Sequence, residues 1–488
     1  MQNKMQYMSS IKTTTLAVLL ALCSLNTAYA EEATTAPEVE PEYTFLDSIK
    51  EGKPMTSFRL RYESVNQDGS QPTATPAVAN ADLKTGEGLT LRSLIGWQSS
   101  PFHNFSIAAQ IIDVSKLQDD FNDSTNGTLI NAISNQPDKQ AYAKIVDPDY
   151  TGVNQLYVDW TGIKNNRVRL GRQAINLDNV RFVGDIGFRQ VMQVFDGISL
   201  ISKTIPDTEI LVGHMESVRQ ITTVLRTKGA LEMLNAKYRY SPTESITGYA
   251  YLSSFNDLGL GRAWFGNAAG TGGLAAGKNG NANQGKDQGN QTYGVRVDGT
   301  HPFNPNFRAH YTAEFAKQTD YSGGDSRIDA HYYKLGGGLG FDNFNVRIDQ
   351  ELLSSNNSQY AFQTPFGTNH LFQGWTDKFL ATPVEGIQDS FITATYRYED
   401  FVFFADYHLI KSDKDFNKVG GGFGDKFGTE WNVAATWNYD KNIMAKIEYG
   451  QFKESDHYTL LPVGNTIPGN RGRVRDTDKL WLTAMYSF

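Results

Sequence analysis

The chain has 488 residues, of which 40% are hydrophobic, 12% aromatic and 20% charged, and its formal net charge is −8. After the N-terminal segment, no stretch approaches the ~18 apolar residues of a membrane-spanning helix, which excludes a helical membrane protein. The aromatic content excludes a disordered chain, and the overall acidity disfavours nucleic acid as a partner. A chain with this many aromatics and with 45 glycines is still compatible with an outer-membrane β-barrel.

The N-terminal segment has the pattern of a secretory signal. Lys4 and Lys12 precede an apolar run at 16–23, and Ala28-Tyr29-Ala30 matches the small-residue cleavage rule. We therefore expect residues 1–30 to be a signal peptide that is cleaved after Ala30. The only cysteine, Cys23, lies in this segment, so the mature chain has no disulfide, thiolate metal site or thiol nucleophile.

The mature chain divides into two predicted parts. Residues 31–53 begin with an acidic run and are predicted to be a short periplasmic segment. Residues 54–488 are predicted to form the barrel, because apolar and polar residues alternate with a period of two along most of this length. The clearest alternating stretches are 58–63, 307–315, 344–349, 431–437, 443–449 and 480–488.

The connections between these stretches favour a barrel over a sandwich. Short links with turn residues, such as Asp342-Asn343 and Glu399-Asp400, alternate with longer ones such as 174–193 and 355–388. This alternation predicts about 18 antiparallel strands, with short periplasmic turns, long extracellular loops and both termini in the periplasm. The terminal Phe488 closes an alternating strand and resembles the C-terminal signal that the barrel-assembly machinery reads. We expect Phe488 to face lipid, in a strand beside the one that holds Phe58.

Two regions resemble the alginate export family of outer-membrane proteins. The first is the segment 46–53 that leads into 58–63, and the second comprises 171–184, 187–190 and Phe195-Asp196. The resemblance implies an 18-stranded monomeric barrel, in agreement with the strand count. The best-known member of the family passes an anionic polysaccharide outward through an arginine-lined pore, whereas many similar chains look more like porins.

The strand faces opposite the apolar ones carry a basic excess, and rings of Arg and Lys favour anions in a pore. The alternative is that these residues form ion pairs that fill the wall. The predicted lumen cations are Arg59, Arg61, Arg92, Arg167, Arg169, Lys237, Arg239, Arg296, Arg308, Arg347, Arg397 and Lys446. The carboxylates on the same faces are Glu63, Asp159, Asp298, Glu314, Asp349, Glu351, Asp406 and Glu448.

The loop at 171–196 is the main candidate for a constriction. It carries Arg172, Arg181, Arg189 and Asp196 together with three phenylalanines, which suggests a packed element rather than a solvated loop. We expect this loop to fold into the barrel, with Arg181 or Arg189 at the narrowest point. The alternative is a self-paired loop that braces the barrel.

These observations predict a passive outer-membrane channel of a Gram-negative cell envelope, for anionic sugars or uronate-type polysaccharide. A general small-solute porin is the alternative in the same class. A structural or adhesive barrel and a barrel-borne surface hydrolase are alternatives from other classes. We expect no enzyme activity, cofactor or metal, since no triad, zinc motif or nucleophile motif is present. The expected partners are outer-membrane lipid, an anionic solute and the assembly machinery.

Overall fold

The computed structural model describes residues 43–68, 83–123, 139, 141–258, 287–418, 421–458 and 475–488. The predicted signal peptide lies outside these residues. Within them, no helix has both the length and the hydropathy needed to cross a membrane.

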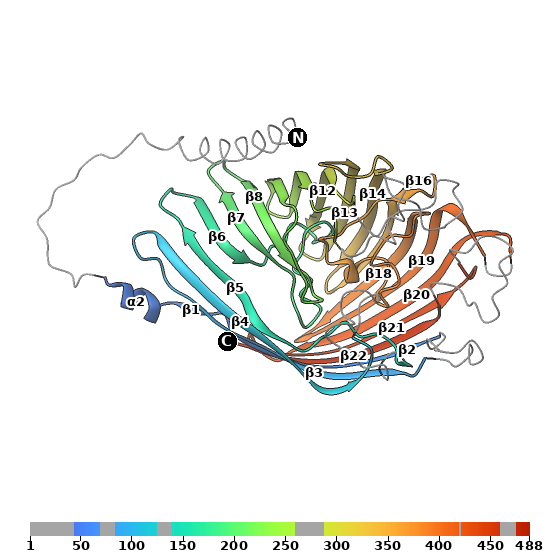
Figure 1. Ribbon diagram of the computed structural model, residues 1–488, viewed down its shortest axis with the longest axis horizontal. Coiled ribbons are helices and arrows are strands. Elements are labelled where there is room, and N and C mark those ends of the chain that lie inside the picture. Colours follow the sequence, from blue (N-terminus) through green and yellow to red (C-terminus); the bar gives the residue numbers. More distant parts are fainter. Residues whose placement is uncertain are drawn as a thin grey trace, which may run out of the picture.

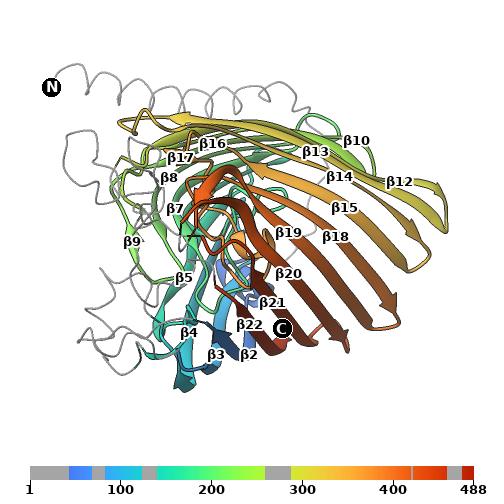
Figure 2. The ribbon, with the colours of Figure 1, turned by 90° about the vertical axis from the view of Figure 1, so that its right-hand side faces the viewer.

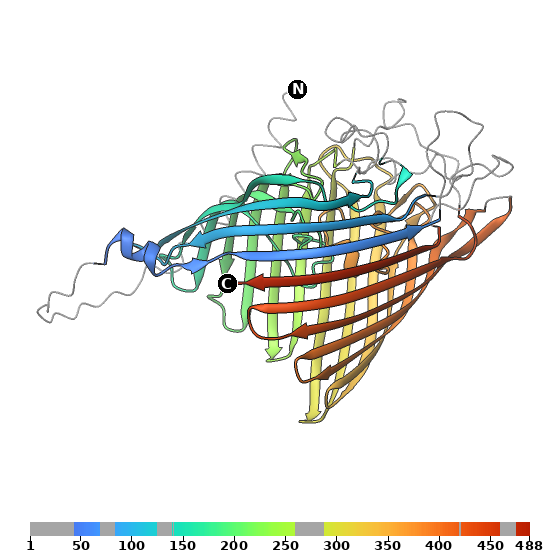
Figure 3. The same ribbon diagram turned by 90° about the horizontal axis from the view of Figure 1, so that it is seen from below.

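Eighteen antiparallel strands form a closed barrel, as the sequence predicts (Figure 1). The last strand pairs with the first, with Phe58 opposite Tyr486, so the sheet has no free edge (Figure 3). The strands are β2 (Ser57–Gln67), β3 (Gly86–Gln98), β4 (Phe105–Asp120), β5 (Tyr150–Trp160), β6 (Asn166–Gln173), β7 (Val194–Ser202), β8 (Thr208–Arg219), β10 (Leu231–Ser241), β11 (Glu244–Ser253), β12 (Asn290–Asn304), β13 (Phe307–Asp320), β14 (Asp329–Phe341), β15 (Phe344–Leu353), β18 (Ile387–Tyr398), β19 (Phe401–Asn417), β20 (Phe423–Asn438), β21 (Ile443–Glu454) and β22 (Thr477–Ser487).

The links between strands alternate in length around the barrel. The short ones, such as 242–243, 342–343 and 399–400, all lie at one end, which we call the turn end, and the longer ones lie at the loop end. In outer-membrane barrels the short turns face the periplasm. Small strands β1 (Lys53–Pro54) and β9 (Leu225–Arg226) extend the sheet beside β3 and β8.

A short helix precedes the barrel within the predicted periplasmic segment. Helix α2 (Phe45–Lys50) begins at Thr44, whose side chain accepts a hydrogen bond from the backbone of Asp47 in a capping box. The indole of Trp97 on β3 donates to the carbonyl of Ile49 at 2.7 Å, which ties the helix to the turn end of the wall.

The outer face of the wall is apolar and carries aromatic side chains near its turn end. This arrangement is the interfacial girdle of a membrane barrel. Phe488 directly follows the last residue of β22 rather than lying within it; it is 60% exposed, and its ring meets Phe58 of the first strand edge-on with centroids 6.2 Å apart. Exposed aromatics close to the turns are Tyr238, Tyr240, Phe303, Phe341, Phe344, Tyr396, Tyr398, Phe401, Trp437, Tyr439 and Tyr486.

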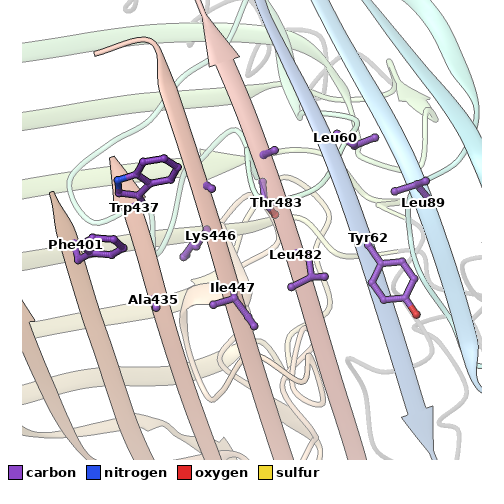
Figure 4. Close-up of a pocket in the computed structure, with 12 residues that line it drawn as sticks. Leu60, Tyr62, Leu89, Phe401, Ala435, Trp437, Lys446, Ile447, Leu482 and Thr483 are labelled. Atoms are coloured by element: carbon purple, nitrogen blue, oxygen red, sulfur yellow. The ribbon is translucent and has the colours of Figure 1, made fainter. Parts of the chain in front are cut away.

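A shallow apolar depression of about 450 Å³ crosses the outer face where the barrel closes (Figure 4). Ala435, Ala445 and Ala484 leave room there, and larger side chains such as Trp437 and Leu482 border it. A shallow depression of this kind on an apolar outer face suits the acyl chains of lipids.

Two of the long connections fold into the barrel instead of extending beyond it (Figures 1 and 2). The first inward segment, residues 174–193, links β6 to β7. The second inward segment, residues 354–386, links β15 to β18 and contains the hairpin β16 (Ser355–Asn356) and β17 (Tyr360–Ala361) and the 3₁₀ turn η4 (Asn369–Leu371). They contact each other directly, since Val183 forms a β-bridge with Phe366.

Candidate functional site: the lumen

All eight predicted lumen carboxylates are held by a partner. Seven of them form ion pairs within the wall or with the inward segments, and Glu314 accepts a hydrogen bond from the neutral hydroxyl of Tyr249. The pairs are Glu63–Arg189, Asp159–Arg169, Asp298–Arg296, Glu314–Tyr249, Asp349–Arg347, Glu351–Arg181, Asp406–His408 and Glu448–Lys446.

The predicted lumen cations are less completely paired. Among the described residues, no side-chain hydrogen bond or ion pair reaches Arg92, Arg167, Lys237, Arg239 or Arg397. The guanidinium of Arg308 is held only by the neutral side chain of Asn345, at 2.6 Å. Apart from Arg92, these residues lie within a few positions of a short link, so the unpaired positive charge gathers at the turn end.

The first inward segment is fixed to the wall by its own backbone carbonyls. Arg59 donates to the carbonyl of Gly187 at 2.7 Å and to that of Arg189, and Arg61 donates to the carbonyl of Phe188. A carbonyl satisfies the guanidinium without cancelling its charge. Arg59 lies directly opposite Arg92 on the neighbouring strand, so this part of the wall stays electropositive beneath the segment.

Arg189 connects the two inward segments. Its guanidinium meets Glu63 of β2 at 3.0 Å and Asp377 of the second segment at 2.6 Å. Asp377 also accepts from Lys479 of β22 and from Nδ1 of His370, both at 2.8 Å. Burial opposes ionisation, but Lys479, His370 and Arg189 together hold the pKa of Asp377 well below its ordinary value. Burial lowers the pKa of His370, so its ring is neutral at pH 7.

Arg181 is fixed in the same way on the opposite wall. Its Nε atom lies 3.0 Å from Glu351 of β15, and its other nitrogens reach Asn369 and Gln373 of the second inward segment. The side chain is only 1% exposed. The next residue, Phe182, packs among rings that include Tyr249, Tyr332 and Phe362, and these rings form an aromatic core at what we call the packed level of the lumen.

The sequence-predicted site residues therefore separate into distinct groups. Arg181 and Arg189 lie between the inward segments and the wall, but at 1% and 4% exposure neither guanidinium faces open lumen. Their contact with a passing solute stays a prediction. Arg59, Arg61 and Arg92 lie on the wall beneath the first inward segment. The remaining predicted arginines lie on the wall nearer the turn end; they are Arg167, Arg169, Arg239, Arg296, Arg308, Arg347 and Arg397.

The register places Arg172 and Asp196 on the outer face, which corrects their predicted lumen position. Arg172 pairs across strands with Leu156, which is 55% exposed on the outside, and with Asp196. Strand β6 leaves the wall after Gln173, so the upper part of β5 lacks a neighbour on that side. Arg172 and Arg219 both donate to the carbonyl of Val153 there, and so they satisfy backbone that β6 no longer pairs.

The second inward segment was predicted only as a long outer loop. It supplies His370, Gln373 and Asp377 to the packed level of the lumen, and Thr376 donates to Glu430 of β20 through its backbone and its hydroxyl. The sequence did contain a signal, because residues 360–379 hold six Phe, Tyr or Trp residues, a higher density than in the loop at 171–196 that is predicted to fold inward. A solvated outer loop has no use for so many apolar rings.

Beneath the inward segments lies a polar cavity of about 420 Å³ at the turn end. Asn179 and Phe372, one from each segment, form its roof, and Thr243 and Thr300 lie near the turns below. Its charged lining consists of Arg296, Lys334 and Arg347 against Asp298 and Asp349, which leaves one positive charge in excess.

A model of the alginate export family matches residues 98–351, just over half of the chain. No curated protein matches the sequence. Among solved structures, OccK5 (OpdH) of Pseudomonas aeruginosa is 13% identical, with a TM-score of 0.56 over 90% of this chain and 98% of that one. OccAB3 of Acinetobacter baumannii is 12% identical, with a TM-score of 0.60 over 90% and 100%, and OccAB2 of the same species is 13% identical, with 0.60 over 90% and 98%.

At these identities the structural likeness concerns the fold, and it agrees with the closed 18-stranded wall described above. The family match rests on the sequence itself; it covers the second of the two regions that carry the resemblance, at 171–196, and the first region, at 46–63, lies outside it. The chain therefore belongs to the alginate export family and is an outer-membrane channel protein of that family.

Proposed function

We propose that this protein is a passive, anion-selective channel whose cargo is an anionic sugar or a uronate-type saccharide. The observation that carries the proposal is the pairing asymmetry of the lumen. The eight carboxylates predicted for the lumen all have a side-chain partner, whereas Arg167, Lys237, Arg239 and Arg397 have no side-chain hydrogen bond or ion pair among the described residues. Fields are focused by a low-dielectric wall, so a small uncompensated charge biases which ions pass.

The turn-end cavity supports a compact cargo. Its volume of about 420 Å³ lies in the range that is usual for small-molecule sites. Guanidinium groups such as Arg347 suit carboxylates, and Phe372 and Phe391 add apolar faces for a sugar ring. A single anionic sugar or a short oligomer fits this arrangement better than a thick polymer does, because the inward segments fill the level above.

The test is ion selectivity in a planar bilayer. In a salt gradient the reversal potential should show a preference for chloride over potassium, and the preference should weaken as the salt concentration rises and screening shortens. An uronate oligomer should then reduce the current. A preference for potassium at low salt would overturn the proposal, and equal passage of both ions would favour the general small-solute porin.

The structural or adhesive alternative predicts a lumen closed by interlocked charges, and the level of Arg181 and Arg189 has that character. The unpaired cations below this level favour a conducting path instead, because a purely structural wall gains nothing from uncompensated charge. The absence of any conductance from a correctly folded barrel would support the structural alternative.

A surface hydrolase would need a serine, a histidine and an acid in one cluster. Ser354 lies 3.1 Å from Nδ1 of His331 at the loop end, but the serine is only 3% exposed and also accepts from the backbone of His331. Among the described residues, no carboxylate hydrogen-bonds to His331. This pair therefore suits a structural contact, and we propose no enzyme activity.

A further inference from the structure

We propose that the turn-end cavity is a binding site for multivalent anions that reach it more readily from the turn side than from the loop side and are held beneath the inward segments. This inference rests on the proposed anion selectivity and adds a direction to it. Its basis is the position of the cavity, the charge inside it and the packing above it.

Packed side chains of the inward segments lie between the cavity and the loop end. Asn179 and Phe372 form the roof. Directly behind them, Arg181 is 1% exposed in its ion pair with Glu351, and Tyr332 and Phe362 are fully buried. An anion from the loop side has to pass around this packing, whereas an anion from the turn side reaches the cavity past wall residues near the turns, such as Thr243 and Thr300.

Lys334 is the cation in this cavity that lacks a carboxylate partner among the described residues. It is flanked across the strands by Glu314 and Glu351, but these carboxylates are bonded to Tyr249 and Arg181. The Lys334 ammonium instead lies over the rings of Phe372 and Phe391, 5.7 Å and 5.2 Å from their centroids. A cation–π contact does not neutralise the charge, so the ammonium stays available to an anion.

Two guanidinium groups stand beside this ammonium. Arg296 lies 3.2 Å from Asp298, and Arg347 lies 2.9 Å from Asp349, and each of these pairs is formed along one strand. A multivalent anion can contact Lys334 and both arginines at once, whereas a chloride ion contacts only one of them. Charge number therefore sets the strength of binding more than shape does.

The experiment measures block of the full-length channel by tripolyphosphate, added to one side of a planar bilayer at a time. The turn side is identified with an Asp400→Cys variant that carries biotin, because avidin then alters the current only from that side. We expect block from the turn side at a concentration about tenfold lower than from the loop side. The Lys334→Gln variant should lose most of this difference.

The matched control is Lys317→Gln on the neighbouring strand, where Lys317 is paired with Asp329 outside the lumen. Tripolyphosphate should block this control variant at the same concentrations as the unaltered channel. Equal block from both sides, or stronger block from the loop side, would overturn the one-sided site while leaving chloride preference intact. Loss of chloride preference in the unaltered channel would instead overturn the proposed function. A Lys334→Gln channel with unchanged one-sided block would also contradict the inference.

Discussion

The two halves of the lumen use the same kinds of side chain for opposite purposes. At the loop end, arginines enter buried ion pairs that hold the inward segments, as Arg181 does with Glu351 and Arg189 with Asp377. At the turn end, arginines such as Arg239 and Arg397 have no partner among the described residues and stay at least partly exposed. An arginine in a barrel lumen is therefore not evidence for a selective pore until its partner is known.

The largest expected effect comes from removing the connection between the inward segments. Arg189→Ala leaves Glu63 and Asp377 buried near each other without their shared partner, which typically costs about 3–5 kcal/mol. We expect the segments to loosen and the single-channel conductance to rise, while the barrel still shifts on a gel when heated. The control Arg169→Ala also removes a buried pair, with Asp159, but touches neither segment, and it should leave the packed level intact. Unchanged conductance in Arg189→Ala would show that Arg189 does not hold the segments.

A smaller effect should follow from crowding the second segment against the wall. Gly374 has a φ of +87°, and a Cβ atom there would lie 2.3 Å from the Glu430 carboxyl group. Gly374→Ala should destabilise the segment by about 1–3 kcal/mol and raise the noise of the open channel. Gly421→Ala is the matched control, because Gly421 also has a positive φ of +104° but nothing within 4 Å of the added Cβ. Equal behaviour of the two variants would assign the effect to backbone strain alone.

The charge of the turn end is tested by removing two unpaired cations together. Arg239→Gln with Arg397→Gln should lower the ratio of chloride to potassium passage by about two- to threefold, without changing folding. The control pair Lys411→Gln with Lys453→Gln removes two loop-end cations that are paired with Asp425 and Asp476. Reversal potentials in a salt gradient measure the ion selectivity of the two double variants. A larger loss of selectivity in the control pair would move the selective region to the loop end.

The smallest expected effect is the pH dependence of the packed level. Burial lowers the pKa of His370. Its contribution to the stability of the packed level is therefore complete above the ordinary histidine pKa of about 6.5 and declines as the pH falls below that value. The pKa of Asp377 is also lowered, so its contribution to the stability of the packed level persists until the pH falls below about 4. We expect a gradual rise of conductance as the pH falls below about 6.5, and a steeper one only below about 4. His370→Gln should flatten the first part alone, and an identical profile in that variant would contradict this assignment.

The architecture could be predicted from the sequence because the barrel wall is built from local rules. Alternation with a period of two decides which side chains face lipid, and the lengths of the links decide where the turns lie. The closure of the last strand, β22, on the first, β2, followed from the same pattern. The inward folding of the second segment was missed, although its aromatic rings at Phe362, Phe366 and Phe372 indicated a buried position.

The sequence by itself determined the barrel and its apolar outer face, and it predicted a basic excess in the lumen. Only the tertiary structure decided which of those charges are free, because pairing depends on neighbours that are distant in the chain, as for Arg189 with Glu63 and Asp377. It also decided that Arg172 lies outside, since the register with Leu156 and Asp196 fixes its face once β6 leaves the wall. Strand periodicity is a local property of the backbone, whereas electrostatic compensation is a property of atoms brought together by closure of the barrel.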